Sequence, residues 1–190
     1  MKRKRKKKGW ARKAFIFLLG AAVSLTILFF FRQEINQLLK LKFAKPVPSK
    51  GKGVVLYFSD GEGEYLIGEK REIIRKGVVE KEATEMIDEL MKGPKGKLLP
   101  TLPRETKLLA LQLNADGVAK VNFNQSLSRN HPGGSSAEVM TVYSIVNSLV
   151  LNFPEIKRVQ ILIEGKEVET LTGHLALKRP ISSKPDLIKR

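Results

Sequence analysis

The feature that most constrains this chain is an uncharged run near its start. Residues Ala14 to Phe31 read AFIFLLGAAVSLTILFFF, eighteen positions without an ionisable side chain. At about 1.5 Å per residue, a helix of this length spans roughly 27 Å, close to the apolar thickness of a bilayer. A buried helix of a soluble protein seldom carries apolar side chains on every face for so long. The run therefore predicts one transmembrane helix over residues 14–31.

Charge predicts how this helix is oriented. Residues 1–33 carry ten Lys and Arg and no Asp or Glu, which accounts for +10 of the net charge of +16. The cytoplasmic flanks of membrane helices carry an excess of Lys and Arg. We therefore expect residues 1–13 to be a basic cytoplasmic tail. The rest of the chain is then exported, and the protein is a single-pass protein of the cell membrane.

A cleaved signal peptide is the competing interpretation of the same segment. The apolar run is long for a signal-peptide core, and it ends in Phe29, Phe30, Phe31 and Arg32 without the small residues of a cleavage site. The sequence contains no Cys, which excludes a lipid on an N-terminal Cys, a disulfide framework and a thiolate zinc site. A retained anchor is the better interpretation.

The rest of the positive charge does not predict nucleic-acid binding. Residues 34–190 carry the remaining +6, a mild excess, so membrane topology explains most of the basic character. We expect no nucleic-acid partner. The partners that we expect are the membrane, through the single anchor, and either an envelope protein or a second copy of the chain.

Beyond the anchor, the chain is predicted to contain one folded domain. Residues 32–53 form a juxtamembrane segment and linker, because the string AKPVPSKGKG is rich in Pro and Gly, which break regular structure. The domain then covers residues 54–180, and residues 181–190 form a polar tail.

Alternation and apolar stripes predict the elements of this domain. We expect strands at 54–59, 65–74 and 157–164, helices at 80–91 and 135–153, and a hairpin of 109–113 with 119–123. Asp116-Gly117 supplies the hairpin turn, because glycine adopts positive φ without a Cβ clash. The order predicts an α+β fold, a βαββαβ-like mixed sheet with both helices on one face, preceded by the transmembrane helix.

No catalytic constellation is visible in the sequence. There are only two histidines, His131 and His174, and no G-x-S-x-G motif. Asp60, Glu62 and Glu64 could gather oxygens around a calcium ion, but a solvated turn is the better interpretation. We therefore expect no enzyme, no cofactor and no metal.

The most unusual segment is His131, Pro132, Gly133, Gly134, Ser135 and Ser136, immediately before a predicted helix. Free N–H groups and the helix dipole at such a position can hold a carboxylate or a phosphate. The alternative is structural: the glycines shape the turn, and Ser135 caps the helix with Glu138 completing a capping box. Both interpretations stay open, and the segment is a candidate ligand or partner loop.

The second helix carries a narrow polar stripe of Glu138, Thr141, Ser144 and Ser148, with Asn152 one turn further on. A solvated helix face usually carries Lys and Glu. Small uncharged polar residues suit close packing against another protein, although they also suit a partly covered face. The stripe is a candidate interface.

The domain resembles the GerMN domain of bacterial sporulation and germination proteins. The resemblance rests on LYFSDGEGEYLIGEKREI, ATEMIDELMKGP, LLPTLPRETKLL and VAKVNFN, and above all on HPGGSSAEVMTVYSIVNSLV followed by VQILIEGKEVETLTGH. It covers the chain from about Val54 to Pro180, and the strings occur in the order that the family has.

This resemblance implies a compact α/β domain similar to ring-building motifs and a non-catalytic, extracytoplasmic role in the cell envelope. The matching positions are His131 to Ser136, Glu138 and Gly173-His174, and no catalytic role comes with them. The sequence has one such domain where the sporulation protein has two in tandem, and a helical anchor in place of a lipid-bearing Cys. Three hypotheses follow: an interaction module, a binding module for a wall-derived or anionic ligand at residues 131–136, and, least favoured, a cell-wall hydrolase.

Overall fold

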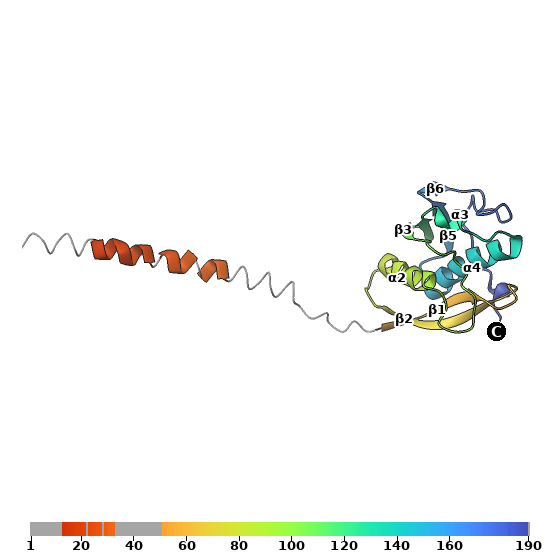
Figure 1. The fold of residues 1–190 in the computed structure, drawn as a ribbon, viewed down its shortest axis with the longest axis horizontal. Coiled ribbons are helices and arrows are strands. Elements are labelled where there is room, and N and C mark those ends of the chain that lie inside the picture. Colours follow the sequence, from red (N-terminus) through yellow and green to blue (C-terminus); the bar gives the residue numbers. More distant parts are fainter. Residues whose placement is uncertain (1–12, 22, 28, 33–50, 190) are drawn as a thin grey trace, which may run out of the picture. The chain divides into compact units, whose positions relative to one another are not determined.

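The computed structural model of this chain describes residues 13–189, apart from 22, 28 and 33–50. The chain divides into two compact units, Met1–Pro48 and Ser49–Arg190 (Figure 1). Residues 1–12 of the expected basic tail, and the part of the expected linker at 33–50, lie outside the described residues.

The described part of the first unit is one helix, Lys13–Arg32. Within the described ranges it is the only helix that is long and apolar enough to cross a membrane, and its 20 residues correspond to about 30 Å. Its large apolar side chains are exposed, for example Phe17 at 80%. Length and composition thus fit a membrane span, although a signal sequence near the N-terminus would pass the same test.

The second unit contains two sheets and the helices that pack with them (Figure 1). In chain order the elements are β1 (Gly51–Ser59), β2 (Leu66–Ile74), α2 (Val79–Met91), β3 (Leu108–Leu113), β4 (Val118–Phe123), α3 (Ser126–Arg129), α4 (Ser135–Asn152), β5 (Arg158–Ile163), β6 (Lys166–Glu167) and η1 (Pro185–Leu187).

The mixed α+β class is confirmed, but the strands form two sheets where a single sheet was expected. Strands β1 and β2 make an antiparallel pair, and β3, β4, β5 and β6 make the second sheet in that order. Within the second sheet β4 and β5 run parallel, and the other neighbours are antiparallel. At the outer edge of β1, polar side chains of α4 hydrogen-bond Val55 and Tyr57, and a single backbone bridge joins Ser59 to Leu99, so no further strand of the described chain extends this sheet.

The predicted hairpin between β3 and β4 is confirmed. Gly117 has φ of 77°, and its N–H donates to the carbonyl of Asn114 at 3.1 Å. The Asn114 side chain closes the turn by accepting hydrogen bonds from the N–H groups of Asp116 and Val118. Glycine is required at 117 because the carbonyl oxygen of Glu155 would lie only 3.0 Å from a Cβ there.

One apolar core joins the two sheets through the helices. Alternate residues of β4 and β5 point inward and are buried, because successive side chains of a strand face opposite sides. They meet the apolar faces of α2 and α4 and the inner face of β1. The largest fully buried side chains include Phe58, Phe123, Phe153, Met86, Ile145 and Leu149.

The C-terminal residues 181–189 belong to the folded unit, so the expectation of a polar tail there is wrong. Ile181 and Val159 exchange two backbone hydrogen bonds of 2.8 Å. Lys184 donates its N–H to the side chain of Asn147, and the N–H of Lys189 donates to the carbonyl of Leu66. The segment is thus hydrogen-bonded to β5, α4 and β2.

Candidate functional site

The polar stripe of α4 faces the inside of the domain, which corrects its interpretation as a partner interface. Glu138, Thr141, Ser144 and Ser148 are each at most 3% exposed. The Ser148 hydroxyl accepts a hydrogen bond from the Tyr57 N–H at 3.1 Å, and the Ser144 hydroxyl donates to the Tyr57 carbonyl at 2.5 Å. Ser144 and Ser148 therefore hydrogen-bond the backbone groups at the edge of β1. In this fold, a partner protein cannot reach the stripe.

The expected capping box at the start of α4 is also absent. Gly134 is the N-cap residue, with φ of 86°, and no side chain caps the helix start. Glu138 points instead to the segment after β6, where its carboxylate accepts hydrogen bonds from the N–H groups of Leu171, Thr172 and His174 and from the Thr172 hydroxyl. Glu138 therefore fixes this segment to the helix.

Burial alone would raise the pKa of Glu138, but the hydrogen bonds from residues 171, 172 and 174 outweigh that effect. The pKa of this carboxyl group therefore lies below its ordinary value. The group is a buried anion with four donors, so it has a structural part in the domain and no free oxygen for chemistry.

His131, the first residue of the candidate loop, is half-buried and held at both ring nitrogens. The Gly133 N–H donates to Nδ1 at 3.0 Å, so Nδ1 carries no proton. Nε2 is then the protonated nitrogen, and it donates to the Thr141 hydroxyl at 3.0 Å. Burial lowers the pKa of His131, although the charge of Glu138 opposes this effect. The ring is thus a neutral connector between the loop and α4.

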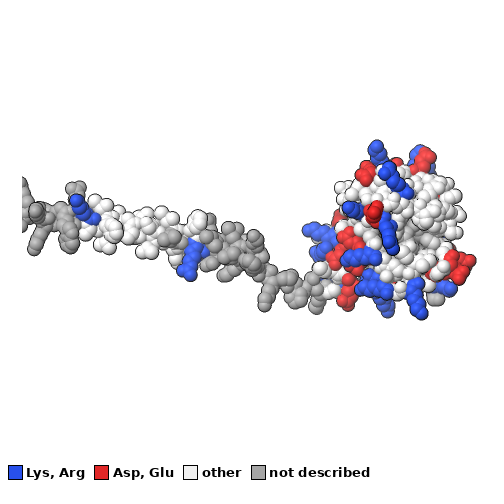
Figure 2. Space-filling model, in the orientation of Figure 1, with Lys and Arg blue, Asp and Glu red and all other residues white. Residues whose placement is uncertain are grey.

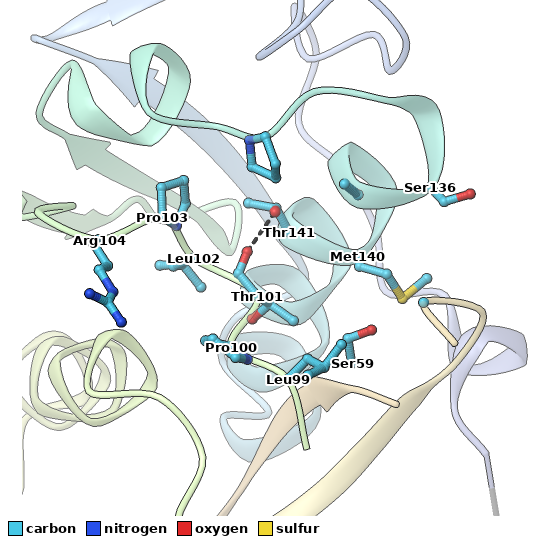
Figure 3. A pocket seen from close by; sticks show the side chains of 13 residues that line it. Ser59, Leu99, Pro100, Thr101, Leu102, Pro103, Arg104, Ser136, Met140 and Thr141 are labelled. Carbon is cyan, nitrogen blue, oxygen red and sulfur yellow. Dashed lines mark hydrogen bonds between the residues drawn. The ribbon is translucent and has the colours of Figure 1, made fainter. Parts of the chain in front are cut away.

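The hydrogen bonds continue from His131 across the domain. The Thr141 hydroxyl donates to the carbonyl of Thr101 at 2.5 Å. The Thr101 hydroxyl lies 2.6 Å from the hydroxyl of Ser144, which itself donates to Tyr57. Figure 3 shows Thr101 and Thr141 pointing toward each other beneath the pocket described next. The loop, the segment around Thr101, α4 and β1 are therefore held by one network.

A pocket of about 470 Å³, here called the central pocket, opens between this network and the solvent. One wall is the segment 99–104, and the other is the loop residue Pro132 with the first turns of α4 (Figure 3). Leu99, Leu102 and Met140 make its surface largely apolar. The remaining lining residues are Ser59, Gly63, Pro100, Thr101, Pro103, Arg104, Ser136, Ala137 and Thr141.

Among the described residues, the lining of the central pocket is largely apolar and carries a single charged side chain. Arg104 is the one charged residue that lines it in the described chain, and no Asp, Glu or His side chain does so. Proton transfer or nucleophilic attack needs a paired acid, base or nucleophile. Apolar walls with one cation at the rim suit an apolar side chain next to a carboxylate.

The other candidate groups have structural surroundings. Asp60 accepts the N–H groups of Glu64 and Tyr65 at its Oδ1, which closes the turn between β1 and β2. In the described residues, no three His, Asp or Glu side chains lie where they could hold a metal ion. Of the predicted loop, Pro132 and Ser136 line the central pocket, whereas Gly133, Gly134 and Ser135 do not.

Sequence reasoning missed the wall formed by residues 99–104. The signal was present, because Pro100 and Pro103 stiffen this connection and place two apolar leucines within it. Its contact with α4 joins Thr101 to Thr141, 40 residues apart in the chain, and no local pattern reveals such a pairing.

The family model Germane, described as sporulation and spore germination, matches residues 55–169. The chain belongs to the Germane family. This confirms the resemblance to GerMN domains, since the match covers most of the folded unit. No curated protein matches the chain.

Solved structures agree with this assignment. A protein from Clostridium perfringens described as a lipoprotein is 28% identical, with a TM-score of 0.52 over 73% of this chain and 93% of that one. The first GerMN domain of the Bacillus subtilis sporulation protein GerM is 19% identical, with a TM-score of 0.52 over 73% of this chain and 98% of that one. The tandem GerMN domains of GerM are 18% identical, with a TM-score of 0.52 over 70% of this chain and 45% of that one. The two similarities to GerM show that this domain has the GerMN fold.

Proposed function

We propose that this Germane protein is anchored in the cell membrane by helix Lys13–Arg32, with its domain outside the cytoplasm. The domain serves there as a non-catalytic interaction module of the cell envelope. The apolar 20-residue helix and the ten Lys and Arg of residues 1–33 support the anchor and its orientation. The family description supports a role in sporulation or germination.

The observation that carries this proposal is the composition of the central pocket. Its walls are apolar, its floor is a satisfied hydrogen-bond network, and Arg104 is its one charged lining residue in the described chain. A glycoside hydrolase needs two carboxyl groups flanking the scissile bond. The pocket offers a partner protein an apolar cavity with a cationic rim.

Crosslinking from two leucines tests the interaction. Leu99, which is 45% exposed, lines the central pocket, whereas Leu109 on β3 is 49% exposed and does not. A photoreactive phenylalanine derivative replaces each residue in turn in the full chain, and each variant is expressed in the bacterium that naturally makes the protein. We expect a protein adduct from position 99 and little from position 109. Equal adducts from both positions, or none from 99, would contradict the proposal.

A second candidate function is the binding of an anionic ligand at residues 131–136. The observation that favours it is that no side chain caps α4, while Arg104 and Ser136 line the same pocket. N–H groups at a helix start attract anions. Titration with inorganic phosphate or acetate, followed by NMR of the backbone amides of 135–137, tests it. Saturable chemical-shift changes at these amides would support anion binding at this loop. Chemical-shift changes spread evenly over the surface amides would contradict it.

A further inference from the structure

The central pocket lies between two further pockets of opposite charge. One of about 600 Å³ shares Gly63, Ser136 and Met140 with it and is lined by the β1–β2 turn, including Glu62 and Glu64. The other, of about 400 Å³, shares Pro100, Leu102, Pro103 and Arg104 with it; its other charged lining residues are Lys92, which pairs with Glu89, and Glu105. The residues that each outer pocket shares with the central pocket lie on different sides of it, Ser136 and Met140 on one side and Pro103 and Arg104 on the other (Figure 3).

The side formed by the β1–β2 turn is acidic and is here called the acidic side. Glu62 and Glu64 are exposed, and in the described part of the chain neither forms an ion pair within 4.0 Å. Lys189 lies above the Tyr65 ring, 5.6 Å from its centroid, and offsets part of this charge. Figure 2 shows acidic side chains gathered at the edge of the folded unit where Figure 1 places the β1–β2 turn.

The opposite side, residues 92–107, is basic and is here called the basic side. This segment holds five Lys and Arg against the single acid Glu105. Lys92 pairs with Glu89, whereas Arg104 forms no ion pair within 4.0 Å among the described residues. Its guanidinium extends away from Met140 and Ser136, which lie on the other side of the pocket (Figure 3).

A surface that is acidic on one side, apolar in the middle and basic on the other is complementary to itself. Rotation by 180° about an axis through the central pocket brings the acidic side of one copy onto the basic side of the next, twice. The two apolar centres, with Leu99 45% exposed in each, then face each other. Two-fold contacts of this kind are isologous and close on themselves. Anchoring in one membrane also raises the effective concentration of copies.

We propose that the central pocket with its acidic and basic sides binds a second copy of this chain in a two-fold contact. The inference rests on the proposed function, because it names the partner of the same pocket. Glu64 of each copy pairs with Arg104 of the other, and the two copies of Leu99 pack against each other near the axis.

Disulfide formation tests the geometry, because the chain has no cysteine of its own. Full-length chains with Glu64→Cys and with Arg104→Cys carry different tags and are expressed together in one membrane. Mild oxidation should link the two differently tagged chains. Chains that all carry Glu64→Cys, or all carry Arg104→Cys, should link on the order of tenfold less, because the two-fold contact separates like positions. Equal linking in all three cases would overturn the proposal.

Charge exchange gives a second measurement that does not depend on cysteine chemistry. Glu64→Arg or Arg104→Glu alone places like charges together and should weaken dimerisation of the full chain in detergent by about tenfold. The double exchange should restore it. Lys120→Glu on the outer face of β4 is the matched control for Arg104→Glu, with the same change in net charge, and should leave the dimer unchanged. Sedimentation equilibrium measures all four.

The outcomes separate this inference from the proposed function. If position 99 crosslinks only to a different protein and the full chain is monomeric, the interaction module stands and the second copy is overturned. If position 99 forms no adduct and the chain is monomeric, both fail. A dimer that the double exchange restores supports both.

Discussion

The side chain of Asn152 hydrogen-bonds the main chain of Val55 in both directions. Its Nδ2 donates to the Val55 carbonyl at 2.7 Å, and its Oδ1 accepts from the Val55 N–H at 2.8 Å. A neighbouring strand would make the same two bonds with this residue. Helix α4 therefore occupies, through its side chains, the position at the β1 edge that another strand would take, and the strands separate into two sheets.

Replacement of Asn152 should destabilise the domain. Asn152→Ala removes both bonds to Val55 and leaves a partly buried N–H and carbonyl without partners, which costs about 2–4 kcal/mol of unfolding free energy. Urea unfolding of residues 49–190, followed by circular dichroism, measures the loss. Asn122→Ala is the control, because the Asn122 side chain accepts one exposed bond, from Gly165, and it should cost less than about 1 kcal/mol. Equal losses would contradict the role of Asn152.

Glu138 should make the domain sensitive to acid. Its folded-state pKa lies below its unfolded value, so its stabilising effect is complete above about pH 4.5 and is lost as the pH falls through the folded-state pKa. Glu138→Gln should cost about 2–4 kcal/mol at pH 7, because the amide NH₂ would face the donors of Thr172 and His174. Unfolding free energies at pH 7 and pH 3 measure both effects. The variant should lose less stability than the natural chain between these two values, and an equal loss would contradict this account.

The loop 131–136 should loosen in mild acid. His131 accepts the Gly133 N–H at Nδ1, which only the neutral ring can do. Because burial lowers its folded-state pKa, the stabilising effect of the neutral ring is present above the unfolded value of about 6.5 and is lost as the pH falls from there to the folded-state pKa. Amide hydrogen exchange at Gly133, corrected for intrinsic rates, should accelerate between pH 7 and pH 5. His174→Gln should leave this change intact, and a loop equally protected at both pH values would contradict it.

Gly117 should tolerate no side chain. Its φ of 77° is costly for other residues, and a Cβ there would lie 3.0 Å from the Glu155 carbonyl oxygen and 3.0 Å from Cγ of Lys157. Gly117→Ala should therefore lower the unfolding free energy by about 1–3 kcal/mol. Gly53→Ala serves as the control, because a Cβ at Gly53 meets nothing within 4 Å. Its effect should stay within about 0.5 kcal/mol, and similar losses for both variants would contradict the steric argument.

The locally encoded parts of the fold were predictable from the sequence. Alternation in 109–113 and 119–123 with Asp116-Gly117 between them specifies the β3–β4 hairpin, since turn chemistry and strand period act over a few residues. The helices α2 and α4 begin and end within one residue of the expected bounds, because apolar stripes and the breakers after them are local signals.

The parts that depend on distant contacts were not predictable. Small polar residues such as Ser148 and Asn152 suit a helix face that contacts a partner protein as well as one that contacts a strand of the same domain. Only the fold shows that these two side chains contact β1. Ile181 and Ile188 are isolated apolar residues in a polar segment, so no periodicity marked their pairing with Val159 and Leu66. Of the candidate loop 131–136, Pro132 and Ser136 line the central pocket, and the opposite wall, residues 99–104, was not predicted.

The most direct test of the proposed topology is to locate the N-terminal segment and the folded domain relative to the membrane. Because the sequence has no cysteine, single substitutions Lys4→Cys and Lys120→Cys each give one thiol. A maleimide that cannot cross membranes is added to intact cells and to permeabilised cells. Labelling of position 120 in intact cells, and of position 4 only after permeabilisation, is the result that we predict. Labelling of position 4 in intact cells, or protection of position 120 until the membrane is opened, would contradict a membrane-anchored domain outside the cytoplasm.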